Sequence, residues 1–74
     1  MDAVFLGMNE AGQKTYEWLN NRQDVNVRAL LTEKDQLSLI KEIKPEIVIS
    51  SGFEHKLPQE IIEVPEKGTI NLHP

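Results

Sequence analysis

Two polar residues, Asn71 and His73, have the types and the spacing to act on a carbonyl group. They lie in the short run 69–73, where apolar and polar residues alternate as in a strand. Successive side chains of a strand point to opposite faces, so Asn71 and His73 should share one face. Ile70 and Leu72 should share the other face, which is apolar and can pack. An amide beside an imidazole can stabilise an oxyanion and handle a proton. No serine, cysteine or lysine stands beside them as an obvious nucleophile, so the attacking group is expected to belong to a substrate.

A second candidate site is the loop 52–58, which follows an apolar run. It combines a conformationally permissive Gly52 with the apolar side chains of Phe53 and Leu57. Such a loop can form an apolar slot lined by main-chain amides, suited to a flat heterocycle. The same residues also fit an ordinary strand-to-helix connection, in which we expect His55 to be exposed.

A third candidate is the turn Gly7-Met8-Asn9 and the residues that lead from it to Gly12. It follows a strand and opens a helix, but it lacks the second glycine of a dinucleotide fingerprint. It also misses a P-loop, because Lys14 stands one residue late. Gly7, Met8 and Asn9 are therefore candidate substrate-binding residues at a strand end, and an ordinary turn is the alternative.

Composition excludes several classes of function. The chain has 74 residues and no cysteine, which predicts one small domain without disulfides or thiolate metal sites. Two distant histidines make no case for a metal. The balance of 12 acidic and 8 basic residues argues against nucleic-acid binding by this chain. No apolar run reaches membrane-spanning length and the start lacks a signal peptide, so we expect a soluble, cytoplasmic chain.

The elements that must position these candidates alternate along the chain. Apolar runs predict strands at 3–6, 25–31, 46–51 and 69–73, and helical spacing or helix-start signals predict helices at 12–21, about 35–44 and 58–63. Trp18 is expected in the core or on an oligomer surface. The order β-α-β-α-β-α-β predicts an α/β fold with a Rossmann-like open parallel sheet. Its strand ends gather residues 7–9, 32–33, 51–53 and 71–73 at one edge, where ligands bind in such sheets.

The residues in two stretches carry a resemblance to a known family. The segment 46–58 reads EIVISSGFEHKLP and the segment 65–74 reads PEKGTINLHP. Together they resemble the N-terminal domain of the folate-dependent formyltransferases, which include methionyl-tRNA, glycinamide ribonucleotide and sugar N-formyltransferases. The resemblance spans essentially the whole chain, and its specificity lies in residues 46–74.

This resemblance implies a transferase of one-carbon metabolism that moves a formyl group from 10-formyltetrahydrofolate to an amine. By resemblance, Asn71 matches the asparagine that hydrogen-bonds the formyl oxygen, and His73 matches the histidine that stabilises the oxyanion and helps proton transfer. The stretch lining the pterin pocket matches Phe53, Glu54, His55, Lys56 and Leu57. The resemblance leaves the formyl acceptor open between tRNA, a sugar nucleotide and a small amine.

Two departures from the family pattern shape the expectations. The region before Asn71 is short, as if one strand–helix unit were missing, and the family's later catalytic aspartate and Ser-Leu-Leu-Pro stretch would fall after Pro74. We therefore expect residues 1–74 to be a truncated formyltransferase-like domain, inactive alone, whose last strand could pair with another chain. The alternatives are a non-catalytic nucleotide- or folate-binding module, and an assembly fragment that depends on a partner.

Overall fold

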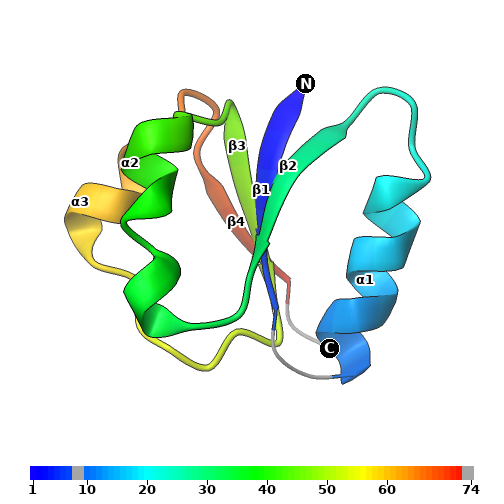
Figure 1. The fold of residues 1–74 in the computed structure, drawn as a ribbon, viewed down its shortest axis with the longest axis horizontal. Coiled ribbons are helices and arrows are strands. Elements are labelled where there is room, and N and C mark those ends of the chain that lie inside the picture. Colours follow the sequence, from blue (N-terminus) through cyan, green and yellow to red (C-terminus); the bar gives the residue numbers. More distant parts are fainter. Residues whose placement is uncertain (8–9, 73–74) are drawn as a thin grey trace.

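A parallel four-stranded sheet forms the centre of the computed structural model, which describes residues 1–7 and 10–72, residue 11 by its backbone only (Figure 1). The strands are β1 (Asp2–Leu6), β2 (Asn26–Leu31), β3 (Ile47–Ser51) and β4 (Thr69–Leu72), in the order β2-β1-β3-β4. The helices are α1 (Glu10–Asn20), the 3₁₀ turn η1 (Lys34–Gln36), α2 (Leu39–Ile43) and α3 (Gln59–Ile62). This arrangement confirms the predicted α/β class and its Rossmann-like open parallel sheet.

The helices divide between the two faces of the sheet. α1 covers one face, and α2 and α3 cover the other (Figure 1). Each face has its own apolar cluster, because alternate residues of β1 and β3 point to opposite sides. The buried residues on the α1 side are Ala3, Phe5, Leu19, Ile47 and Ile49. Those on the α2 side are Val4, Leu6, Leu31, Leu37, Ile40, Val48 and Ile61. Both central strands are thus covered on both faces, as their continuous apolar runs predict.

β2 departs from the simple alternation that the sequence suggests. Its register with β1 shifts between Ala3 and Val4, which pair with Val27 and Ala29 respectively. The extra residue, Arg28, turns the strand over, so Val27 packs with the α1 cluster and Ala29 with the α2 cluster. The regular alternation of apolar residues from Val25 to Leu31 predicted that these residues share one face of the sheet. The structure divides them between the two faces.

α1 lies very close to the end of β3. A side chain at Gly12 would overlap the carbonyl oxygen of Ser51, so only glycine permits this approach. One turn later, the hydroxyls of Thr15 and Ser51 are 3.3 Å apart and hydrogen-bonded. The helix begins at Glu10, two residues before the predicted start, and ends at Asn20, close to the predicted end.

The segment between β2 and β3 is split into two short helical pieces. Gln36 accepts hydrogen bonds from the backbone amides of Thr32 and Glu33, both at 3.0 Å, and so caps the 3₁₀ turn. The start is therefore capped through Glu33 and Gln36. Leu37 and Ile40 are buried against the sheet, as their spacing predicts. Lys44 ends α2 in the left-handed conformation with φ 50°, directly before Pro45.

β4 forms one edge of the described sheet and exposes its apolar side. Ile70 and Leu72 are 45% and 42% exposed, on the face opposite α3. The sequence predicted that this face can pack, but within the described residues it does not enter the core. Trp18 is 59% exposed and lies under the guanidinium of Arg22, so the core alternative is wrong, and its place on an oligomer surface stays a prediction. Pairing of β4 with another chain stays a prediction.

The described helices are too short and too polar to cross a membrane.

Candidate functional site

A groove of about 400 Å³ lies beside the carboxyl half of β3 and β4, on the α3 side of the sheet. Ligand pockets commonly occupy about 300–1,000 Å³, so the groove can hold part of a small molecule. Its lining comes from β3, the following loop, α3 and β4: Ser50, Phe53, His55, Lys56, Leu57, Ile62, Thr69 and Asn71. Parts of two of the three regions singled out in the sequence therefore meet in one place, namely Thr69 and Asn71 of the last strand and the loop 52–58.

The loop after β3 is held by its own apolar side chains. Gly52 has φ 72°, a conformation that favours glycine, and it turns the chain out of the strand. Phe53 and Leu57 then pack against the core cluster on the α2 side. These two side chains hold the loop at both ends, and His55 and Lys56 between them line the groove. The apolar slot for a flat heterocycle stays a prediction.

His55 is half-buried, although the sequence predicted an exposed side chain. Its ring meets that of Phe53 edge to face, with the centroids 5.3 Å apart and the planes at 73°. This arrangement is a favourable one for aromatic pairs, and it covers part of the imidazole. His55 therefore forms part of the groove wall.

The opposite wall is β4, which hydrogen bonds fix to β3 and α3. Thr69 donates its hydroxyl to the carbonyl oxygen of Ile62 at 3.2 Å, which ties the strand to α3. In the parallel register, Asn71 lies beside Ser50. Asn71 is exposed, and both residues line the groove, where the Ser50 side chain is buried. An amide and a hydroxyl thus stand beside an apolar slot, which suits binding a polar heterocycle by its edge.

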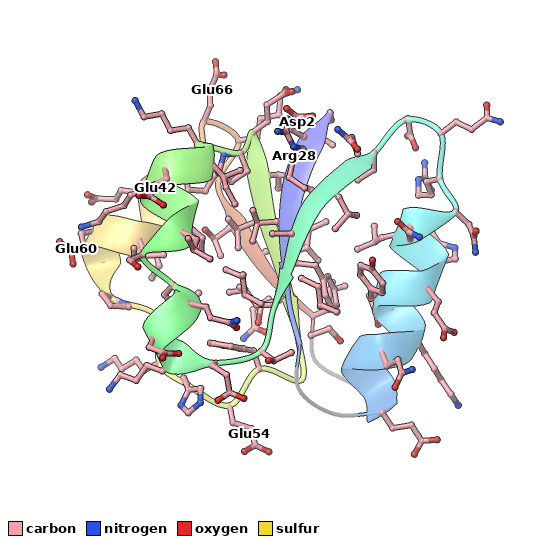
Figure 2. All side chains as sticks on the ribbon, in the orientation of Figure 1. Asp2, Arg28, Glu42, Glu54, Glu60 and Glu66 are labelled. Carbon is pink, nitrogen blue, oxygen red and sulfur yellow. The ribbon has the colours of Figure 1, made fainter. Side chains whose placement is uncertain are left out.

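The remaining predicted site residues take different positions. Lys56 is exposed at the groove. Glu54 points away from the molecule at the carboxyl-end edge (Figure 2) and is not among the lining residues. Gly7 is buried, and its amide donates to the carbonyl of Leu31 at 3.1 Å, so it lies against β2 and away from the groove. The predictions for Met8, Asn9 and His73 fall outside the described residues.

Three lining residues, Ser50, Ile62 and Thr69, were not predicted from the sequence. Ser50 lies on the same strand face as Val48, and Thr69 stands two positions before Asn71, so strand periodicity could have found both. Ile62 belongs to α3, and only its packing against β4 brings it to the groove. Nothing in its local sequence distinguishes it from Ile61, which is buried in the core.

The strongest charge pair in the described residues is far from the groove. Arg22 holds Asp24 through two hydrogen bonds of 2.9 and 2.8 Å in the turn before β2. The side-chain hydrogen bond from Arg22 lowers the pKa of the Asp24 carboxyl below its ordinary value, and the same pairing raises the pKa of Arg22. This pair belongs to the turn and takes no part in the groove.

Within the part of the chain that the structure describes, no group of three or more His, Asp and Glu side chains is placed to hold a metal ion.

Comparison with known proteins gives partial matches to one kind of enzyme. The chain is 30% identical over 44 residues to a methionyl-tRNA formyltransferase of Dehalococcoides mccartyi, and 36% identical over 44 residues to one of Clostridium beijerinckii. It is 37% identical over 41 residues to that of Clostridioides difficile. These matches cover 60%, 60% and 55% of this chain, and only 14%, 14% and 13% of the relatives' length.

No family model matches the sequence, and no solved structure matches it significantly. The matching enzymes are formyltransferases by name, which is the family that residues 46–74 resemble. The parallel α/β sheet of this chain agrees with the fold that the resemblance implies. These partial matches confirm the resemblance of this chain to the formyltransferases.

Proposed function

We propose that this chain supplies the folate slot and the first catalytic side chains of an enzyme that transfers a formyl group from 10-formyltetrahydrofolate to an amine. The observation that carries the proposal is the groove itself, in which the 52–58 loop and Asn71 line one cavity. The partial similarity to methionyl-tRNA formyltransferases supports it independently.

The groove has the chemistry to receive the pterin ring. Phe53 and Leu57 provide an apolar wall for the flat faces of the ring. The hydroxyls of Ser50 and Thr69 provide hydrogen-bonding groups for its polar edge. Burial of a flat ring between such walls is the common way in which proteins bind heterocycles of this size.

In the proposed reaction the amine nitrogen attacks the formyl carbon, and the carbonyl oxygen becomes an oxyanion. Asn71 donates a hydrogen bond from its side-chain amide to this oxygen, which is worth most when the negative charge has developed. The bond between the formyl carbon and N10 then breaks, N10 takes up a proton, and the amine loses one. We assign the proton transfer to His73, as the family resemblance implies. The products are a formamide and tetrahydrofolate.

The acceptor amine remains open among the charged tRNA that the relatives' name indicates, a sugar nucleotide and a small amine. The acidic balance of the chain does not favour tRNA contacts by these residues. We therefore propose that any contact with a nucleic acid is made by residues other than these 74, and that the protein works in the cytoplasm. We expect ligand binding, and not turnover, from the 74 residues alone.

Calorimetry with the 74-residue chain tests the folate slot. The probe is 5-formyltetrahydrofolate, a stable isomer of the formyl donor, with ADP as the competing nucleotide ligand. We expect binding of the folate and none of ADP. Binding of ADP without the folate would overturn the proposal and favour a nucleotide-binding module.

A formyl-transfer assay tests the catalytic assignment in any longer protein or complex where these residues support the reaction. There, Asn71→Ala should lower kcat by about 10²–10³-fold, as loss of an oxyanion donor does, with a smaller effect on KM. Asn20→Ala, which changes an exposed asparagine at the end of α1, is the matched control. A rate within twofold of the parent for Asn71→Ala would remove Asn71 from the catalytic set.

A further inference from the structure

The proposed folate groove adjoins a second hollow of about 570 Å³ beside α3. Lys56, Leu57 and Ile62 line both, so the two share a wall. The second hollow adds Lys34, from η1, as well as Pro58 and Gln59. We call it the lysine annex. Its lining contains two ammonium groups and no carboxylate, in a chain whose net charge is −4.

The two lysines are not engaged elsewhere in the described part of the chain. The ion pairs there are Arg22–Asp24, Arg28–Asp2 and Lys41–Glu60, which leave Lys34 and Lys56 outside. Lys34 and Lys56 are both exposed, so their ammonium groups can reach a ligand in the annex.

Acidic residues do occur nearby, but none is among the lining residues of the annex. Glu33 and Asp35 flank Lys34 in the sequence, and all three line another hollow together with His55. Glu54 points away from the molecule at the carboxyl-end edge (Figure 2). These neighbouring carboxylates therefore reduce the positive potential of the annex, but no carboxylate belongs to its lining.

From this geometry we infer that the annex binds the flexible, carboxylate-bearing tail of the ligand whose ring occupies the groove. The inference rests on the proposed function, because it takes a folate as the ligand. A folate has a flat ring at one end and glutamate carboxylates at the other. A ring seated against Phe53 leaves the tail to pass Leu57 toward Lys56 and Lys34. The two hollows share Lys56, Leu57 and Ile62 as lining residues, so they lie next to one another.

The expected effect is moderate because exposed ion pairs are weak. Two such pairs should together strengthen binding by about three- to tenfold, and salt should screen most of this gain. Each further glutamate on the tail adds a carboxylate and should strengthen the effect. The tail would then tune affinity, while the groove selects the ring.

Calorimetry with the whole chain and three probes separates the annex from the groove. The probes are 5-formyltetrahydrofolate triglutamate, p-aminobenzoyl-triglutamate, which has the tail without the ring, and 6-methyltetrahydropterin, which has the ring without the tail. The annex variant is Lys34→Gln, which changes the annex and not the groove, and the control is Lys14→Gln, an exposed lysine outside both. Circular dichroism checks that both variants remain folded.

We expect the annex variant Lys34→Gln to bind the triglutamate about two- to fivefold more weakly and the ring probe as the parent does, with no effect of the control. Unchanged triglutamate affinity in the annex variant would overturn the inference while leaving the proposed function intact. Lysine-dependent binding of the tail probe without binding of the ring probe would overturn the folate slot and keep the annex. If inorganic tripolyphosphate bound as tightly as the triglutamate, the annex would be a general anion site, and the assignment to a carboxylate tail would be overturned.

Discussion

The imidazole of His55 meets the ring of Phe53 edge to face, with the ring centroids 5.3 Å apart. This contact joins a side chain anchored in the core to one that lines the groove. The wall of the proposed folate slot is therefore continuous with the hydrophobic core. Changes in this wall should alter both ligand binding and stability, and changes in the core should reach the slot.

Phe53→Ala should weaken binding of 5-formyltetrahydrofolate by about tenfold, because the ring of the ligand loses its apolar wall. Calorimetry measures the affinity. Leu30→Ala, which truncates an exposed apolar residue outside the groove, is the control and should bind as the parent does. Equal affinities for the two variants would show that Phe53 does not contact the ligand.

Gly12→Ala should destabilise the chain by about 1–3 kcal/mol, because the new methyl group would overlap the carbonyl oxygen of Ser51. Backbone lies on both sides of this contact, so it cannot be relieved by rotating a side chain. Urea denaturation followed by circular dichroism measures the change. The neighbouring exposed substitution Gln13→Ala should stay within about 0.5 kcal/mol of the parent, and a similar value for Gly12→Ala would contradict the close approach of α1 and β3.

Ile40→Ala should lower the free energy of unfolding by about 2–5 kcal/mol, because Ile40 is fully buried on the inner side of α2. A core of this size supplies only about 3–5 kcal/mol of net stability, so the variant should be largely unfolded at 37 °C. Leu39→Ala on the same helix is the matched control, since Leu39 is 38% exposed. Thermal unfolding of the two variants should separate them clearly, and coinciding curves would be evidence against this core.

The Arg22–Asp24 pair should make a pH-dependent contribution to stability. The pKa of Asp24 is lower in the folded chain than in the unfolded one, chiefly because Arg22 donates hydrogen bonds to its carboxylate. The contribution is therefore present above the unfolded value of about 4, and it is lost as pH falls through the lower folded value. The parent should be more stable than Asp24→Asn at pH 6 and equal to it near pH 2.

Denaturation curves at several pH values measure this difference. Arg22→Gln should remove the same increment, and 0.5 M NaCl should reduce it because the pair is exposed. A difference between parent and Asp24→Asn that does not change with pH would exclude this ion pair as its cause.

The sequence alone determined the order of the elements and the identity of the buried strands. The runs around Val4 and Val48 have no polar alternation, which requires cover on both faces, and the structure provides it. The spacing of Leu37 and Ile40 likewise predicted the buried side of a helix. These features are local, because the period of the backbone dictates which side chains share a face.

The tertiary structure decided what depends on contacts between distant segments. The bulge at Arg28 turned β2 over, and no turn residue or break in the alternation announces it. The exposure of Trp18 depends on which side of α1 the sheet occupies. The groove itself arises because the 52–58 loop and β4 pack on either side of Ser50. The sequence could name Phe53 and Asn71 as candidates from their chemistry, but only packing between elements could bring them to one cavity.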